Sequence, residues 1–87
     1  MKEILINCAG VSSMAQMHDI LARELNFPGW YGRNLDALHD CLTGICEDTR
    51  ITVLHFPALP FPAAGLLRVL RDSEQENEKL EISLVTN

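Results

Sequence analysis

Three short apolar runs, separated by segments of helical periodicity, constrain the fold of this 87-residue chain more than any other feature. The runs cover residues 4–6, 51–54 and 80–86, and they are typical of buried strands. A helix between successive strands makes their pairing parallel, because only a crossover returns the chain to the same end of the sheet. The order predicts an α/β fold: a small two-layer sandwich with a three-stranded parallel sheet, three to four helices and one partly bare sheet face.

Local signals predict where the elements end. The last apolar run alternates most strongly, which favours an edge strand. Ser13 is a predicted N-cap for the first helix, and Asn34 for the second, which we expect to run to residue 45 or 46. The third helix is expected to begin near Pro62 and to stop at Asn77. Residues 56–62 contain three prolines and are expected to form a loop.

Length and composition predict a single globular domain over residues 1–87. The hydrophobic fraction of 47% is too high for a disordered chain. No apolar run approaches the roughly 20 residues needed to cross a bilayer, so we expect no membrane association. The first residues lack the pattern of a signal peptide, and we expect a cytoplasmic protein that is monomeric when free.

The charge is distributed unevenly. The net charge is −5, and residues 34–87 carry all of this imbalance, with four basic and nine acidic side chains. An acidic surface repels phosphate backbones and attracts basic proteins. We therefore expect a basic protein partner and no direct binding of nucleic acid.

Cysteine and histidine spacings match no metal motif. Cys8, Cys41 and Cys46 form no C-x-x-C pair, and we expect all three to be free thiols. His18 lies on the apolar side of the first helix and is expected to be half-buried with its polar atoms satisfied. The sequence predicts neither a metal site nor a cofactor.

The second helix has two distinct sides. Asp36, Asp40, Thr43 and Glu47 lie at spacings that share one side, and the opposite side is apolar. Two aspartates one turn apart repel each other, so helix stability does not account for them. This side is either a solvated acidic surface or a recognition surface for a basic partner.

The loop before this helix favours recognition. Gly29 and Gly32 bracket the adjacent rings of Trp30 and Tyr31, next to the aspartates. Aromatic side chains beside charged groups are typical of binding hot spots. Alternatively, one ring covers the small core, and we expect one ring to be mostly buried and the other exposed. The sequence alone does not decide which ring is buried.

Enzymatic activity is not expected. Asp36 and Asp40 could act as an acid–base pair only in a pocket that gives the two carboxyl groups different environments. An exposed helix side offers no evident pocket, and the chain has no serine nucleophile motif or phosphate-binding glycine loop. A small enzyme built on this pair is therefore the least favoured of three functions.

Residues 25–44, LNFPGWYGRNLDALHDCLTG, resemble the signature of the barstar-like ribonuclease inhibitor family. That signature has a proline, two aromatic residues, a glycine, any residue, Asn-Leu-Asp-Ala-Leu, any residue and Asp-Cys-Leu. The resemblance extends weakly over nearly the whole chain, with a shortened region around residues 47–61. It implies a three-stranded parallel sheet in which the second helix and its preceding loop block the active site of a small bacterial ribonuclease.

The resemblance also implies roles for individual residues. Asp40 matches the carboxylate that occupies the place of a substrate phosphate, Asp36 matches a supporting carboxylate, and Asp72 matches a glutamate that pairs with a basic group. Trp30 stands where the family has a tyrosine. The predicted partner-binding residues are Trp30, Tyr31, Gly32, Asn34, Asp36, His39, Asp40, Thr43, Gly44, Glu47 and Asp72.

Two positions depart from the best-known family member, because His39 and Ile45 replace tryptophans.

The favoured function is an inhibitor or immunity protein that blocks a small basic bacterial ribonuclease by acidic mimicry of RNA phosphate. The alternative is an interaction module of the same fold whose basic partner is not a ribonuclease.

Overall fold

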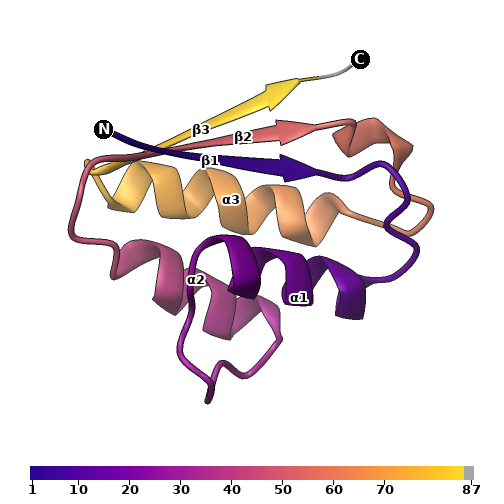
Figure 1. The fold of residues 1–87 in the computed structure, drawn as a ribbon, viewed down its shortest axis with the longest axis horizontal. Coiled ribbons are helices and arrows are strands. Elements are labelled where there is room, and N and C mark those ends of the chain that lie inside the picture. Colours follow the sequence, from indigo (N-terminus) through magenta and orange to yellow (C-terminus); the bar gives the residue numbers. More distant parts are fainter. Residues whose placement is uncertain (86–87) are drawn as a thin grey trace.

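The computed structural model describes residues 1–85, and its three strands form one parallel sheet in the order β1-β2-β3 (Figure 1). The strands are β1 (Lys2–Asn7), β2 (Thr49–Leu54) and β3 (Leu80–Val85). Ile4 is paired with Ile51, and Ile51 with Ile82, so the register aligns the inward-facing residues. The predicted parallel sheet with β3 at an edge is confirmed, although Thr86 of the predicted last run lies outside the described residues.

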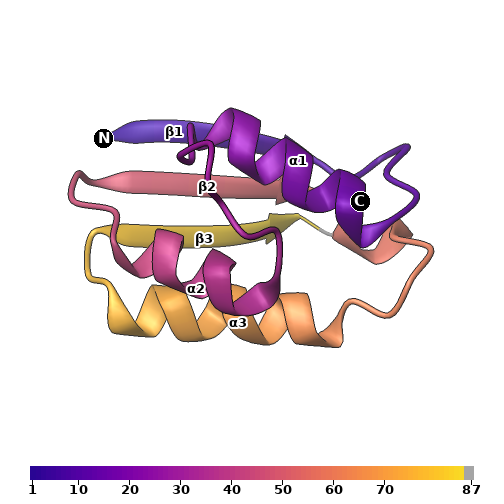
Figure 2. The ribbon, with the colours of Figure 1, turned by 90° about the horizontal axis from the view of Figure 1, so that it is seen from below.

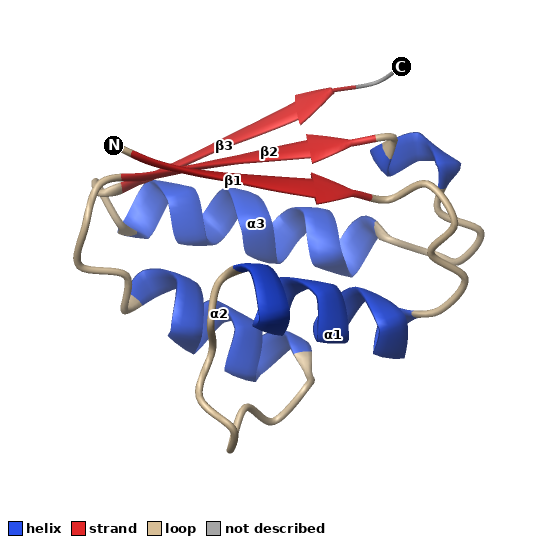
Figure 3. Cartoon of the chain, viewed as in Figure 1, coloured by secondary structure: helices blue, strands red, loops and turns tan. Residues whose placement is uncertain are grey.

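The helices lie on one side of this sheet (Figures 1 and 3). They are α1 (Met14–Glu24), α2 (Leu35–Thr43) and α3 (Ala64–Glu76), and a 3-10 turn, η1 (Phe56–Ala58), follows β2. Seen from below, α1 lies beside β1, and α2 lies beside α3 (Figure 2). Within residues 1–85 no helix covers the opposite face, where the side chain of Leu5 is 56% exposed. The predicted two-layer sandwich with one partly bare face is confirmed.

The predicted helix starts agree with the capping contacts. Ser13 Oγ accepts a hydrogen bond of 3.2 Å from the backbone N–H of Gln16, and Asn34 Oδ1 accepts one of 2.8 Å from Ala37 N–H. Side chains of this kind satisfy backbone donors that the first helical turn leaves unpaired. Both predicted N-caps are confirmed.

Two other helix boundaries were predicted imperfectly. The second helix ends at Thr43 with Gly44 as its C-cap, so the predicted end at residue 45 or 46 is wrong. Helix α3 begins at Ala64, just beyond Pro62, and its predicted stop at Asn77 is confirmed. The proline-rich stretch is a loop that contains η1 at its start.

The core lies between the sheet and the helices. Its fully buried side chains include Ile6, Met17, Leu21, Leu38, Leu42, Ile51, Val53, Leu66 and Leu70. Helices α2 and α3 approach closely at Gly65, where an added Cβ would lie 3.0 Å from Leu35 Cδ1. The close contact fixes α2 against α3, and α2 is the helix that carries the predicted recognition residues. In the part of the chain described, no helix is long and apolar enough to cross a membrane.

Candidate partner-binding site

Tyr31 anchors the loop between α1 and α2. Its side chain is only 8% exposed, its ring centroid lies 4.9 Å from that of Phe27, and its hydroxyl shares a hydrogen bond of 2.7 Å with His18 Nδ1. Burial raises the pKa of Tyr31 to about 12 and lowers the pKa of His18, so both groups are neutral at pH 7. Tyr31 is therefore the buried ring of the aromatic pair, and His18 is buried and satisfied, more deeply than the expected half-burial.

Arg33 also holds this loop against α1. Its guanidinium donates a hydrogen bond of 3.2 Å to the carbonyl oxygen of Ala15 and lies 3.0 Å from Asp19 Oδ1. Arg33 and Asn26, at the two ends of the loop, adopt left-handed backbone conformations with φ of 53° and 56°. The loop is thus held against α1, and it presents Trp30 with 82% of its surface exposed. A large exposed aromatic ring on a fixed loop is typical of a binding anchor.

Asn34 and Gly32 position the start of α2. Beyond its capping contact, Asn34 donates through Nδ2 to the carbonyl oxygen of Gly32 at 3.3 Å. A Cβ added to Gly32 would lie 3.2 Å from the same Nδ2 atom, so the loop approaches the cap closely. Both residues were predicted to contact a partner, and the structure gives each of them a role in holding the loop and helix together.

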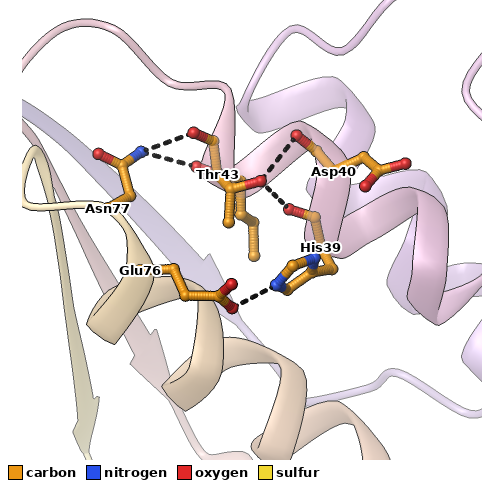
Figure 4. Close-up of polar contacts among 6 residues, drawn as sticks. His39, Asp40, Thr43, Glu76 and Asn77 are labelled. Carbon is orange, nitrogen blue, oxygen red and sulfur yellow. Dashed lines mark hydrogen bonds and ion pairs between the residues drawn. The ribbon is translucent and has the colours of Figure 1, made fainter.

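The acidic side of α2 is shorter than predicted. Asp36 and Asp40 are exposed one turn apart, as expected. Thr43 is half-buried, and its hydroxyl donates back to the carbonyl oxygen of His39 at 2.8 Å (Figure 4). Glu47 lies beyond the helix end and pairs with Lys2 at 3.6 Å, so the prediction that it shares the helix side is wrong.

His39 connects this side of α2 to α3. Its Nε2 lies 2.6 Å from Glu76 Oε2, and its ring points toward α3, whereas the Asp40 carboxylate points away from α3 (Figure 4). The hydrogen bond to Glu76 raises the pKa of His39, and the negative charges of Glu76, Asp40 and Asp72 raise it further. Sequence reasoning included Asp72 but missed Glu76, one turn further along the same helix.

A cleft of about 450 Å³ opens between the anchored loop and α2. It is lined by Leu25, Asn26, Phe27, Pro28, Trp30, Ala37, Asp40, Cys41, Gly44 and Ile45. The expectation that α2 borders no pocket is wrong, because Asp40 lines this cleft. Asp36 is not among the lining residues, so the two carboxylates do not share the enclosed site that an acid–base pair needs.

Metal binding has no support from the geometry of residues 1–85. No group of three histidine, cysteine or carboxylate side chains in that range is arranged to hold a metal ion. The arrangement is instead one of an exposed aromatic ring, an apolar cleft and carboxylates on a short helix. These features suit binding of a basic protein surface.

Comparison with known proteins identifies the family. The family model described as Barstar (barnase inhibitor) matches residues 1–86. The chain belongs to the barstar family. A Bacillus subtilis (strain 168) protein named "Putative ribonuclease inhibitor YrdF" is 50% identical over 44 residues. That match spans 51% of this chain and 48% of the relative, about half the length of each.

Family membership accounts for the resemblance of residues 25–44 and extends it over the sheet and all three helices. The description of the family model and the name of the relative both refer to inhibitors of ribonucleases. Barstar-family proteins are inhibitors, which fits the expectation that this chain is not an enzyme. The residues that would contact a partner remain a prediction.

Proposed function

We propose that this protein binds the active site of a small basic bacterial ribonuclease and blocks it, with the carboxylates of α2 and α3 taking the place of RNA phosphates. Trp30 and the cleft beside it form the apolar part of the contact, and Asp40 lies where the cleft meets the acidic side of α2. An inhibitor of this kind would serve as an immunity protein in a cell that makes or meets such an enzyme.

The distribution of ion pairs is the observation that carries this proposal. Most carboxylates pair with a basic side chain of the protein itself: Glu3, Asp19, Glu24, Glu47, Asp48, Glu74, Glu76 and Glu81. Among the acidic residues described, those outside every such pair are Asp36, Asp40, Asp72 and Glu78. The family signature includes Asp36 and Asp40, and the wider family resemblance adds Asp72 as a predicted contact with the enzyme.

Unpaired carboxylates on fixed helices suit electrostatic mimicry. A carboxylate with no internal cation has no ion pair to give up before it accepts hydrogen bonds from arginine or lysine side chains of a partner. Because the loop and α2 are held by Tyr31, Arg33 and Asn34, little ordering is required on binding. The net charge of −5 accelerates the approach of a basic enzyme.

The test compares two unpaired carboxylates. Asp40→Ala should weaken binding to barnase by about 2–5 kcal/mol, mainly through faster dissociation, as is typical when one partner of a buried charge pair is removed. Glu78→Ala removes an unpaired carboxylate outside the predicted contact, so it should change mainly the association rate and its salt dependence. Asp36→Ala should follow Asp40→Ala in its effect, and Asp72→Ala should follow both.

The measurements are association and dissociation rates, together with inhibition of RNA cleavage. Equal losses for Asp40→Ala and Glu78→Ala would show that general acidity accounts for binding, and would contradict mimicry. Complex formation without any change in RNA cleavage would instead favour an interaction module with a different function. Trp30→Ala keeps the charge unchanged, so its effect isolates the apolar part of the contact.

A further inference from the structure

His39 lies among carboxylates from two helices. Its Nε2 contacts Glu76 Oε2 of α3 at 2.6 Å, and its side chain is 33% exposed. On its own helix, Asp40 is the next residue and Asp36 lies one turn before. On α3, Asp72 lies one turn before Glu76. Acidic groups of both helices therefore act on this imidazole at the edge of the proposed contact surface, Glu76 by direct contact and Asp40 and Asp72 through their charges.

These surroundings favour the charged form of the imidazole. The hydrogen bond to Glu76 raises the pKa of His39 from its ordinary value near 6.5, and the charges of Glu76, Asp40 and Asp72 raise it further. Protonated His39 neutralises one carboxylate within the surface. Loss of that proton makes the surface more negative by one charge, without any change of fold.

We propose that His39 couples partner binding at this surface to the release of a proton: its imidazolium holds Glu76 in the free protein, and it deprotonates when a basic side chain of the partner takes that carboxylate. This inference rests on the proposed function, because it needs a basic partner on α2 and α3. The incoming cation competes with His39 for Glu76 and repels the imidazolium directly.

Linkage makes the coupling measurable in both directions. If the partner binds the deprotonated form more tightly, binding must lower the proton affinity of His39 by the same factor. If binding lowers the pKa of His39 by one unit, the form with neutral His39 binds the partner ten times more tightly than the form with protonated His39. For a partly exposed histidine we expect a gain of about three- to tenfold as pH rises through the His39 titration.

The experiment is calorimetric titration of the protein with barnase across the His39 titration, in pairs of buffers that differ in ionisation enthalpy. The buffer dependence gives the number of protons released per complex. Groups of barnase titrate equally with every variant, so the difference between the unmodified protein and His39→Gln isolates His39. The unmodified protein should release more protons, and its affinity should rise more steeply with pH.

His55→Asn is the matched control. His55 precedes η1, outside α2 and α3, and its backbone is left-handed with φ of 59°, a conformation that asparagine tolerates well. This variant should release as many protons as the unmodified protein. Equal release by His39→Gln and the unmodified protein would overturn the inference and leave the proposed function intact. Absence of any complex at every pH would overturn both.

Discussion

Replacing Asn77 with alanine should destabilise the fold more than its position at a helix end suggests. Asn77 is the C-cap of α3, and its side chain reaches across to the end of α2 (Figure 4). Its Nδ2 donates to the carbonyl oxygens of Leu42 and Ile45, each at 3.0 Å, and approaches that of Thr43 at 3.4 Å. Its Oδ1 accepts from Lys79 N–H at 3.0 Å. One side chain therefore closes the end of α2 and the turn into β3.

The magnitude follows from these contacts. The last carbonyl groups of a helix have no partner within the helix, and leaving them unpaired in the interior is costly. Asn77 makes three hydrogen bonds at about 3.0 Å, and each neutral bond contributes about 1 kcal/mol net. Asn77→Ala should lower the free energy of unfolding by about 3 kcal/mol. That is a large fraction of the roughly 5–15 kcal/mol typical of small domains.

Urea denaturation followed by circular dichroism measures this change. The midpoint should fall while the slope with denaturant stays the same, since the native fold is retained. Asn7→Ala is the matched control, because Asn7 makes a single exposed hydrogen bond of 2.9 Å, to Ala9 N–H. That control should cost less than about 1 kcal/mol. Equal losses for the two variants would refute the claim that Asn77 closes α2.

Two further predictions concern buried polar groups. Among residues 1–85, the buried Oγ of Ser73 has no hydrogen-bond partner. Ser73→Ala should therefore raise the free energy of unfolding by about 1 kcal/mol. A lower urea midpoint for this variant would show that the hydroxyl does have a hydrogen-bond partner. Tyr31 is the one tyrosine of the chain, and its ultraviolet titration in the folded protein should have a midpoint pKa of about 12, because burial disfavours the phenolate. A raised pKa means that the contribution of this group to stability is present below the unfolded pKa near 10 and is lost as pH rises to about 12. A midpoint near 10 would show that the phenol is exposed.

The sheet and the helix starts could be predicted from the sequence because their signals are local. Apolar runs, helical spacing and the caps Ser13 and Asn34 each depend on a few neighbouring residues. The end of α2 could not be read from hydrophobic spacing, because Ile45 continues the apolar pattern beyond the helix. Gly44 is typical of a helix end, but the hydrophobic spacing favoured a later one. Asn77, more than thirty residues away in the chain, donates hydrogen bonds to the carbonyl groups at the end of α2.

The candidate site was predicted in its residue types but not in its geometry. The sequence placed two aromatic rings beside two aspartates, and the choice between the rings depended on the contact of Tyr31, in the loop, with His18 of α1. The bond from His39 to Glu76 likewise joins residues far apart in the chain. Such contacts follow from how α1 packs against the loop and α3 packs against α2, which no local pattern specifies.

Helix α2 is built to present charge rather than to be stable alone. Its nine residues are fewer than an isolated helix needs in water, and its two exposed aspartates repel each other. The fold offsets this through contacts at both ends: Asn34 caps the start, and Asn77 pairs the carbonyl groups at the end. Asp36 and Asp40 can therefore remain without internal cations, because the helix is held by its termini and by its buried side. In the proposed complex, a basic partner that pairs with both aspartates would remove this repulsion, so the same feature that weakens the isolated helix would strengthen the complex.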